Sequence, residues 1–443
     1  MKQPPVACAL GSALRQFLTP EVWKQAHQAW RCTYTPPRWA LQPLVWVVLT
    51  MSWCTGQSQE ERFAAARAAY VAHYQRSRRP GTTLAGFLSA LAKLPLPVLR
   101  VLAAGVRQRL GKLGDESLRL QGGWLPLACD GSRLECPRSA ELQQRLGEAG
   151  KPGSAPTIYR TTLVLLPLGV VWSWCWGKGT ASEHFHLRQL LRTLPRQALL
   201  VADAYYLGYD LFTAIRQAHA GFLVRLSSRA YLYTIEHIPL AAWTEGLVYY
   251  WPTDVQKAGR PPILARLLRV KGKKADVWLL TSVLEPAQLS HRMAGQVYRW
   301  RWRNEGLFRD YKRLLGKVKL SGRTVALVHR EAEGSLLALQ LLLARAVEAP
   351  AGQPVALPGS PRRELLRLRG AITAALRSLG PRQFARYQQL LAVVRSQARP
   401  PRVSAKVRQA WARRKEHKPP KPPKLRVMSE ALKAKLIKGV NVA

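Results

Sequence analysis

Acidic residues are scarce in this sequence, and two of them stand where a carboxylate could do chemistry. Asp130 follows the apolar run 125–129, and Asp203 follows the apolar run 199–202. A carboxylate at the end of a buried strand points into the crevice in which α/β sheets bind ligands. Either residue could equally be a polar group that begins a turn, so neither defines a site on its own.

A third carboxylate, Glu305, lies in a stretch that predicts one long helix, Arg292–Lys317. At 100° per residue, other polar side chains share with Glu305 a stripe roughly 80° wide; they are Tyr298, Arg301, Arg309 and Lys312. The apolar side chains fall on another face, which is expected to be buried. An ordinary i, i+4 pair of Arg301 with Glu305 would be worth about 0.2–0.5 kcal/mol, but it leaves Tyr298 and Lys312 unexplained.

Two carboxylates on strands and one on a helix can together hold two divalent metal ions about 3.5–4 Å apart. Such a pair activates water or a DNA 3′-hydroxyl and stabilises the leaving oxygen. Oxygen-only ligands in a phosphate site favour Mg²⁺ or Mn²⁺ over zinc. We therefore expect Asp130, Asp203 and Glu305 to be catalytic residues and metal ligands, with the neighbouring arginines binding phosphate.

Other chemical sites are less well supported. The Cys and His residues between positions 129 and 186 lack the spacing of a zinc finger. The segment Gly177-Lys178-Gly179-Thr180 lacks the glycine that begins a P-loop, so nucleotide hydrolysis is not indicated.

The charge of the chain points to a polyanionic partner. Its 443 residues include 69 Lys and Arg against 25 Asp and Glu, a formal net charge of +44, and this excess is typical of nucleic-acid binding. A content of 47% hydrophobic residues excludes a wholly disordered chain. The apolar stretch Leu41–Cys54 is too short to span a bilayer. Six scattered Cys residues without a C-x-x-C pair fit a reducing cytoplasm, so we expect a cytoplasmic, nucleoid-associated protein without a membrane partner.

The elements that must position these residues change in kind along the chain. Positions 14–120 predict helices, which could contact DNA or form an ordinary bundle with a basic surface. From Trp124 the pattern is strands, a helix over Ser182–Leu194 and another strand, which predicts an α/β sheet. Residues 221–284 are rich in β-like runs, and Arg399–Lys438 has 14 basic and 2 acidic residues, typical of a flexible arm for phosphate backbones.

The spacing Tyr298-x2-Arg301-x3-Glu305-x6-Lys312 resembles the Y-R-E-K signature of DDE transposases of insertion-sequence family four. The contexts Asp130-Gly-Ser and Leu-Val-Ala-Asp203 are similar to the first two catalytic motifs of that family, in the same order. A β-rich insertion before the Glu is also similar. The likeness extends from about Trp124 to Leu343 and implies an RNase H-like mixed sheet, an α/β fold, with Asp130, Asp203 and Glu305 as ligands of two Mg²⁺ or Mn²⁺ ions.

The resemblance also implies contacts to DNA. Tyr298, Arg301 and Lys312 match residues that hold the transposon end, and Arg225 matches a basic position after the second Asp. Trp278 matches a Trp that can stack against a base flipped out of the duplex, an interaction worth about 1–3 kcal/mol. Two positions depart from the family: Ala204 replaces a frequent polar residue, and Asn304 replaces an apolar one, so it needs a hydrogen-bond partner.

The resulting expectation is a cut-and-paste DNA transposase. It would bind terminal inverted repeats as a homodimer, cleave the ends, pass through a hairpin and join the 3′-hydroxyl to target DNA. Alternatives are an RNase H-like nuclease without strand transfer and a domesticated, non-catalytic DNA-binding protein. The expected divisions are a helical DNA-binding domain (1–120), a catalytic core in two parts (121–220 and 285–350), a β-rich insertion (221–284), a helical region (351–398) and a polybasic tail (399–443).

Overall fold

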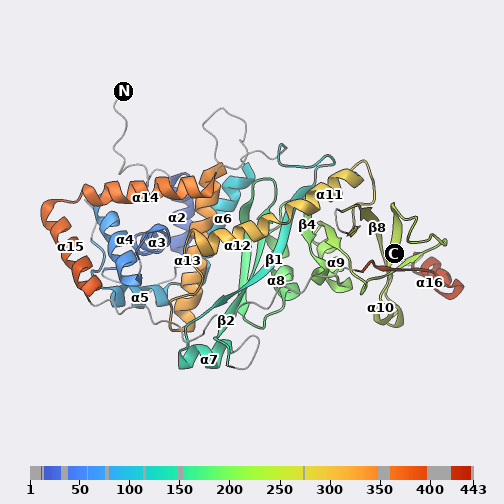
Figure 1. The fold of residues 1–443 in the computed structure, drawn as a ribbon, viewed down its shortest axis with the longest axis horizontal. Coiled ribbons are helices and arrows are strands. Elements are labelled where there is room, and N and C mark those ends of the chain that lie inside the picture. The colour runs from blue at the N-terminus through green and yellow to red at the C-terminus, as the bar shows by residue number, and fades with distance from the viewer. Residues whose placement is uncertain are drawn as a thin grey trace.

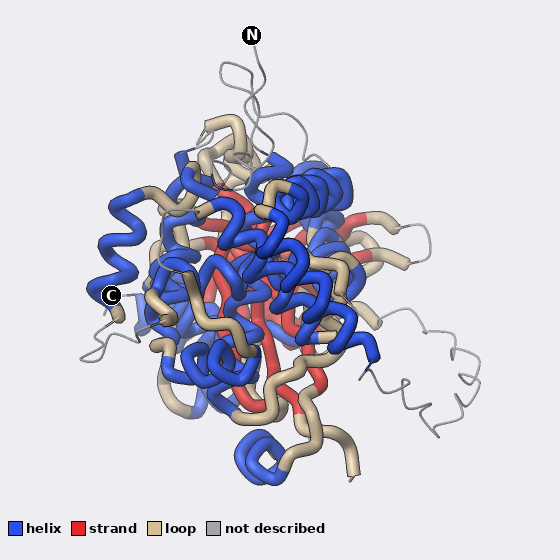
Figure 2. The backbone as a smooth tube through the Cα atoms, turned by 90° about the vertical axis from the view of Figure 1, so that its left-hand side faces the viewer, coloured by secondary structure: helices blue, strands red, loops and turns tan. Residues whose placement is uncertain are grey.

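The protein is described by a computed structural model, which covers residues 11, 14–30, 38–56, 58–74, 79–112, 116–147, 153–272, 275–347, 360–396 and 421–440. It is elongated: N-terminal helices lie at one end, and a large sheet runs from the middle to the other end (Figure 1). Viewed from the helical end, the strands lie in the interior and helices cover them (Figure 2). The ten-stranded sheet has the order β10-β6-β7-β8-β9-β5-β4-β1-β2-β3.

Five strands form the part of the sheet that carries the candidate site. They are β1 (Leu125–Glu135), β2 (Thr157–Leu165), β3 (Val170–Lys178), β4 (Ala198–Ala202) and β5 (Gly221–Arg225). Strand β2 is antiparallel to β1 and β3, whereas β1, β4 and β5 are parallel. This order and these directions agree with an RNase H-like core, so the predicted α/β class with a mixed sheet is confirmed.

The segment between β5 and the Glu305 helix extends the same sheet. It contributes β6 (Tyr231–Thr234), β7 (Glu245–Tyr250), β8 (Ile263–Val270) and β9 (Val277–Thr281), and β9 pairs with β5. The predicted runs therefore form strands, but two elements were missed: β6, and the short helix α10 (Thr253–Lys257). Because β8 and β9 continue the ladder of β5, this segment is joined to the core by backbone hydrogen bonds.

Helices predicted in the N-terminal part are present as α2 (Pro20–Ala29), α3 (Leu41–Trp53), α4 (Gln59–His73), α5 (Leu84–Lys93) and α6 (Leu96–Lys112). The apolar stretch expected to be too short for a bilayer is α3, which is buried on nearly every side. No single helix in the described ranges is long and apolar enough to cross a membrane, although α5 and α6 would pass that test as a pair bent by 83°.

A central helix, α13 (Val325–Val347), joins the N-terminal helices to the sheet. The indole of Trp53 in α3 donates to the carbonyl of Ala338 at 3.2 Å, and the amide of Gln340 donates to the carbonyl of Val171 in β3 at 3.0 Å. Residues of α3, α6, α13 and β3 belong to one hydrophobic core. The N-terminal helices are therefore packed on the sheet through α13.

The C-terminal part differs from the prediction of a flexible arm. Helices α14 (Pro361–Arg377) and α15 (Pro381–Ser396) lie beside the N-terminal helices, and residues 397–420, the first part of the predicted tail, are outside the described residues. Beyond them, β10 (Lys424–Val427) pairs in parallel with β6, and α16 (Glu430–Val440) follows. The prediction was wrong for 424–440, because β6 offers an unpaired sheet edge to which even a basic strand can add.

Candidate active site

Asp130 and Asp203 lie side by side on neighbouring parallel strands. The strand register pairs Ala128 of β1 with Val201 of β4. Asp130 lies two residues after Ala128, and Asp203 lies two residues after Val201. Asp203 directly follows β4, as predicted, and its carboxylate caps the short helix η2 (Ala204–Tyr206) by accepting from the Tyr205 amide at 2.9 Å. Asp130 does not end its strand: β1 continues to Glu135, because β2 keeps pairing with it beyond this point.

Burial sets the charge state of Asp130. It raises the pKa of this carboxyl to about 6, and the negative charges of Asp203 and Glu183 add to the rise. The Gly131 amide, which donates to Oδ1 at 2.8 Å, and the guanidinium of Arg301 act in the opposite direction. Acidic groups held together with incomplete compensation are typical of a cation site.

Glu183 is an acidic neighbour that sequence reasoning missed. It is the first residue of α8 (Glu183–Leu190), and it accepts a hydrogen bond from the Tyr159 hydroxyl of β2. A Cβ added to Gly131 would lie 2.8 Å from the carboxyl carbon of Glu183, so this carboxylate reaches β1 beside Asp130. Only tertiary packing brings it there, because its sequence context is that of an ordinary N-terminal helix residue after the Ser182 cap.

Glu305 lies on a different element from these carboxylates. It lies on α12 (Arg303–Arg313) with an exposed side chain and makes no ion pair within the described ranges. In the same ranges, no three His, Cys, Asp or Glu side chains are arranged to hold a metal ion. The structure therefore brings Asp130 and Asp203 together on the sheet and places Glu305 on α12 with its side chain exposed.

The helix that was predicted to be continuous over Arg292–Lys317 is broken. It is two helices, α11 (His291–Trp300) and α12, joined by a tightened turn. The amides of Arg301 and Trp302 bond to carbonyls three residues back, at 3.2 and 3.3 Å. Because such a turn advances about 120° per residue instead of 100°, the single polar stripe does not survive it.

The stripe residues before the break still face the two aspartates. Arg301 is buried, with Nη1 3.9 Å from Oδ2 of Asp130 and its guanidinium over the rings of Tyr298 and Trp302. Burial raises the pKa of Tyr298, while Arg301 and Arg225 lower it. Arg301 thus lies beside Asp130, and Tyr298 is near Arg301, Arg225 and Asp203.

The remaining predicted DNA contacts lie on α12 and β9. Arg309 is exposed and Lys312 is half-buried on α12. Trp278 on β9 has only 7% of its surface exposed, and the Arg269 guanidinium lies 5.5 Å from the centre of its ring. Asn304 is fully buried. Neither its amide oxygen nor its nitrogen has a hydrogen-bond partner in the described part of the chain, so the partner expected from its sequence position is not found there.

The donor chemistry of the two aspartates fits a hard divalent cation. Both side chains offer carboxylate oxygens, and Asp130 retains 22% side-chain exposure, so solvent reaches it. Burial raises the pKa of Asp130, the charge of Asp203 adds to the rise, and a bound cation would favour the ionised carboxylate. Asp130 and Asp203 are therefore the residues that could hold Mg²⁺ or Mn²⁺, and Glu183 is a further carboxylate near Asp130.

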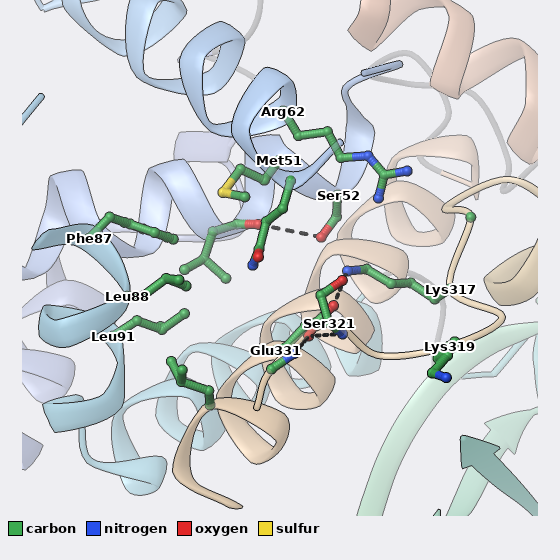
Figure 3. Close-up of a pocket in the computed structure, with 15 residues that line it drawn as sticks. Met51, Ser52, Arg62, Phe87, Leu88, Leu91, Lys317, Lys319, Ser321 and Glu331 are labelled. Carbon is green, nitrogen blue, oxygen red and sulfur yellow. Dashed lines mark hydrogen bonds and ion pairs between the residues drawn. The ribbon is translucent and has the colours of Figure 1, made fainter. Parts of the chain in front are cut away.

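A cavity of about 230 Å³ is lined by residues of α3, α4, α5 and α13 and by the segment that follows α12 (Figure 3). Glu331 of α13 is at its wall: one carboxylate oxygen accepts from Lys317 at 2.6 Å, and the other accepts from the amides of Ser321 and Gly322 at 2.7 and 2.9 Å. Met51, Phe87, Leu88 and Leu91 form the apolar side. The buried carboxylate thus organises the connection between α12 and α13.

Comparison with known proteins places a family match on this region. Residues 127–341 match the family model described as Transposase DDE domain. A solved structure, the cryo-EM structure of piggyBac transposase synaptic complex with hairpin DNA, aligns over 86% of this chain and 84% of its own, with 10% identity and a TM-score of 0.47. No curated protein matches the sequence. The part of the chain that contains Asp130, Asp203 and Glu305 is therefore similar to a transposase DDE domain.

Proposed function

We propose that this protein is a DNA transposase that cleaves the ends of its own element and joins them to target DNA. The observation that supports this most directly is the pair Asp130 and Asp203 beside Arg301, within the segment that matches a transposase DDE domain. Two adjacent carboxylates with a buried arginine suit phosphodiester chemistry. The +44 charge of the chain provides the attraction to DNA.

Asp130 and Asp203 would hold Mg²⁺ or Mn²⁺, and bound cations would activate the attacking oxygen and stabilise the leaving one. Arg301, Arg225 and Tyr298 would bind the phosphates that flank the cleaved bond, and Arg309 and Lys312 would contact the backbone farther along α12. Glu305, whose exposed side chain lies on α12 about one turn after Arg301, would be the third metal ligand.

The finer steps of the proposal follow the likeness of the Y-R-E-K residues. They are cut-and-paste excision at terminal inverted repeats, a hairpin intermediate, strand transfer into target DNA, a homodimer that pairs the ends, and action in the cytoplasm on nucleoid DNA. In this scheme Trp278 would stack on a flipped base after the Arg269 guanidinium has moved from its ring.

The test uses the purified full-length chain and duplexes that carry the inverted repeats flanking its coding sequence. Nicking, hairpin formation and joining of pre-cleaved ends to a plasmid are scored with and without Mg²⁺. Asp130→Asn, Asp203→Asn and Glu305→Gln should each lose at least about 100-fold in end cleavage while retaining DNA binding. Cleavage by Asp130→Asn at the wild-type rate would refute the assignment.

The exposed position of Glu305 favours one second candidate, a DNA-binding protein without catalysis. This candidate predicts tight binding of the ends with no Mg²⁺-dependent product from the wild type. A nuclease would instead cleave the ends and fail to join pre-cleaved ones.

A further inference from the structure

A fully buried arginine, Arg160, lies in the middle of β2 without a polar partner in the described part of the chain. None of its three side-chain nitrogens has a hydrogen-bond partner within the described residues. Aromatic rings surround the guanidinium instead: its central carbon lies 4.5 Å from the ring centre of Tyr311, 4.7 Å from that of Phe308 and 5.6 Å from that of Trp176. A cation over aromatic faces is attracted by their electron density.

The arginine lies on the same face of the sheet as Asp130. Register pairs Arg160 with Ser132 and Thr162 with Asp130, and residues two apart on a strand share a face. Phe308 and Tyr311 belong to α12, so the guanidinium lies between the sheet and this helix. Glu305 precedes Phe308 by three residues, about one turn.

In the described part of the chain, the side-chain hydrogen bonds from α12 to other elements are at its ends. The Arg303 guanidinium, at its start, donates to the carbonyls of Leu166 and Pro167 at the β2–β3 turn. The Tyr311 hydroxyl lies 2.7 Å from the hydroxyl of Ser335 on α13. Asn304 is buried between these anchors without a partner in the described part of the chain. The centre of the helix therefore rests on the guanidinium of Arg160 and on Leu307, which belongs to the hydrophobic core.

Stability alone does not account for an arginine at this place. A buried charge without an ionic partner is unfavourable, and replacing such a group by an apolar residue of similar volume is often neutral or stabilising. Burial lowers the pKa of Arg160 to about 10, the direction expected of a cation that lacks compensation. A residue that opposes stability, yet contacts the helix carrying Glu305, points to a role in the site.

We propose that Arg160 is a positioning residue: through the rings of Phe308 and Tyr311 it holds α12 on the sheet and sets the place of Glu305 relative to Asp130. This inference rests on the proposed function, since it gives the position of Glu305 a catalytic purpose. It concerns the docking of the helix and requires no contact of Arg160 with DNA.

The experiment compares Arg160→Met and Arg160→Lys in the full-length chain. Arg160→Met keeps an unbranched apolar side chain and removes the charge, whereas Arg160→Lys keeps a cation for the rings. Arg266→Met is the matched control, because Arg266 is also a buried arginine on a strand but donates to the carbonyls of Leu284 and Leu289 and pairs with Glu245 at 3.4 Å.

Four quantities are measured: the unfolding temperature, the Kd for end DNA, the rate of end cleavage against Mg²⁺ concentration, and hydrogen exchange of peptides covering 303–313. For Arg160→Met we expect an unchanged or higher unfolding temperature, an unchanged Kd, cleavage slower by roughly 10- to 100-fold, a higher half-saturating Mg²⁺ concentration and faster exchange in α12. Arg160→Lys should recover part of the cleavage, and Arg266→Met should lower the unfolding temperature.

Two outcomes overturn the proposal. One is wild-type cleavage and α12 exchange in Arg160→Met; the other is a loss of cleavage that only follows a loss of folded protein, as in Arg266→Met. If the wild type cleaves no end DNA, the proposed function fails, and hydrogen exchange of 303–313 still decides whether Arg160 holds α12.

Discussion

Nη1 of Arg301 lies 3.9 Å from Oδ2 of Asp130, and this contact joins the turn between α11 and α12 to the strand that carries the first aspartate. The arginine only partly compensates the carboxylate. Burial, with help from Asp203 and Glu183, still raises the pKa of Asp130 from 3.8 to about 6. At neutral pH the folded protein therefore keeps a carboxylate ionised in a place that disfavours its charge.

Asp130→Asn should stabilise the metal-free protein while removing activity. A folded pKa above the unfolded one means that the penalty is absent below pH 4, grows as pH rises to 6 and is complete above it. A rise of roughly two pKa units corresponds to about 2–3 kcal/mol. At pH 7.5 without divalent ions, the Asn variant should therefore have a higher unfolding temperature than wild type. At pH 4 the two proteins should unfold at the same temperature. Thermal unfolding at the two pH values measures this.

Asp210→Asn is the matched control for that comparison. Asp210 is exposed and pairs with Arg260 at 2.8 Å, so its loss should change stability by less than about 1 kcal/mol at either pH. Equal unfolding temperatures of Asp130→Asn and wild type at pH 7.5 would show that the carboxylate carries no penalty.

The sequence was sufficient to place the two aspartates on apolar strands, and insufficient for the helix that carries Glu305. Asp203 could be placed because β4 is a short apolar run that ends at it, and pairing of β1 with β4 brings Asp130 alongside. The helical-wheel angle predicted for Glu305 assumed an unbroken α-helix. The amides of Arg301 and Trp302 instead bond to carbonyls three residues back, which rotates the side chains of all later residues around the helix axis. No local pattern marks such a tightened turn, because both residues keep right-handed helical dihedral angles.

Glu183 and Arg160 could not have been found for a different reason. Their importance comes from partners far along the chain, Tyr159 for Glu183 and Phe308 with Tyr311 for Arg160. Arg160 has the sequence context of a strand residue whose side chain could equally face solvent. Only the packing of α12 over β2 shows that it is buried.

Gly131→Ala should disturb the site without disturbing the rest of the fold. A methyl group there would overlap the Tyr159 hydroxyl and approach the Glu183 carboxyl carbon at 2.8 Å, so the hydrogen bond between these two residues must break or move. Overpacking of this kind is worth about 1–3 kcal/mol. We expect a lower unfolding temperature and slower end cleavage, measured on the same preparation.

Gly111→Ala serves as the control for that variant. Gly111 lies in α6, and an added methyl group would meet only a ring carbon of Trp172 at 3.8 Å, an ordinary contact. Alanine is favoured over glycine in a helix by about 0.5–1 kcal/mol, so Gly111→Ala should be neutral or more stable. A Gly131→Ala protein as stable and active as Gly111→Ala would contradict this prediction, because it would show that Tyr159 and Glu183 can move aside without cost.

Glu331→Gln should lower the free energy of unfolding, because Glu331 holds the connection between α12 and α13. Although burial raises the pKa of Glu331, the Lys317 ammonium and the amides of Ser321 and Gly322 together hold it below its ordinary value. A lowered folded pKa means that this contribution to stability is present above about pH 4.5 and is lost as pH falls through the folded pKa. The variant strands a buried ammonium, which costs about 3 kcal/mol.

Urea unfolding across pH 3 to 7 checks that prediction. The difference between wild type and Glu331→Gln should be largest near pH 7 and should shrink toward pH 3, where the wild-type carboxylate is protonated. Lys317→Met combined with Glu331→Gln should recover part of the loss, because no charge is then left buried. A difference independent of pH would show that the ion pair does not contribute.

Trp302 should contribute more to DNA binding than to stability, in contrast with Trp278. Trp302 lies at the turn next to Arg301 and has 57% of its surface exposed, whereas Trp278 has 7%. Stacking of a base on an exposed aromatic ring is worth about 1–3 kcal/mol, so Trp302→Ala should weaken binding of end DNA by roughly 5- to 150-fold at an unchanged unfolding temperature. Trp278→Ala should lower the unfolding temperature, since it empties a buried position. Binding is measured by fluorescence anisotropy of a labelled end duplex at fixed salt, and unchanged affinity in Trp302→Ala would exclude this side chain as a base-stacking surface.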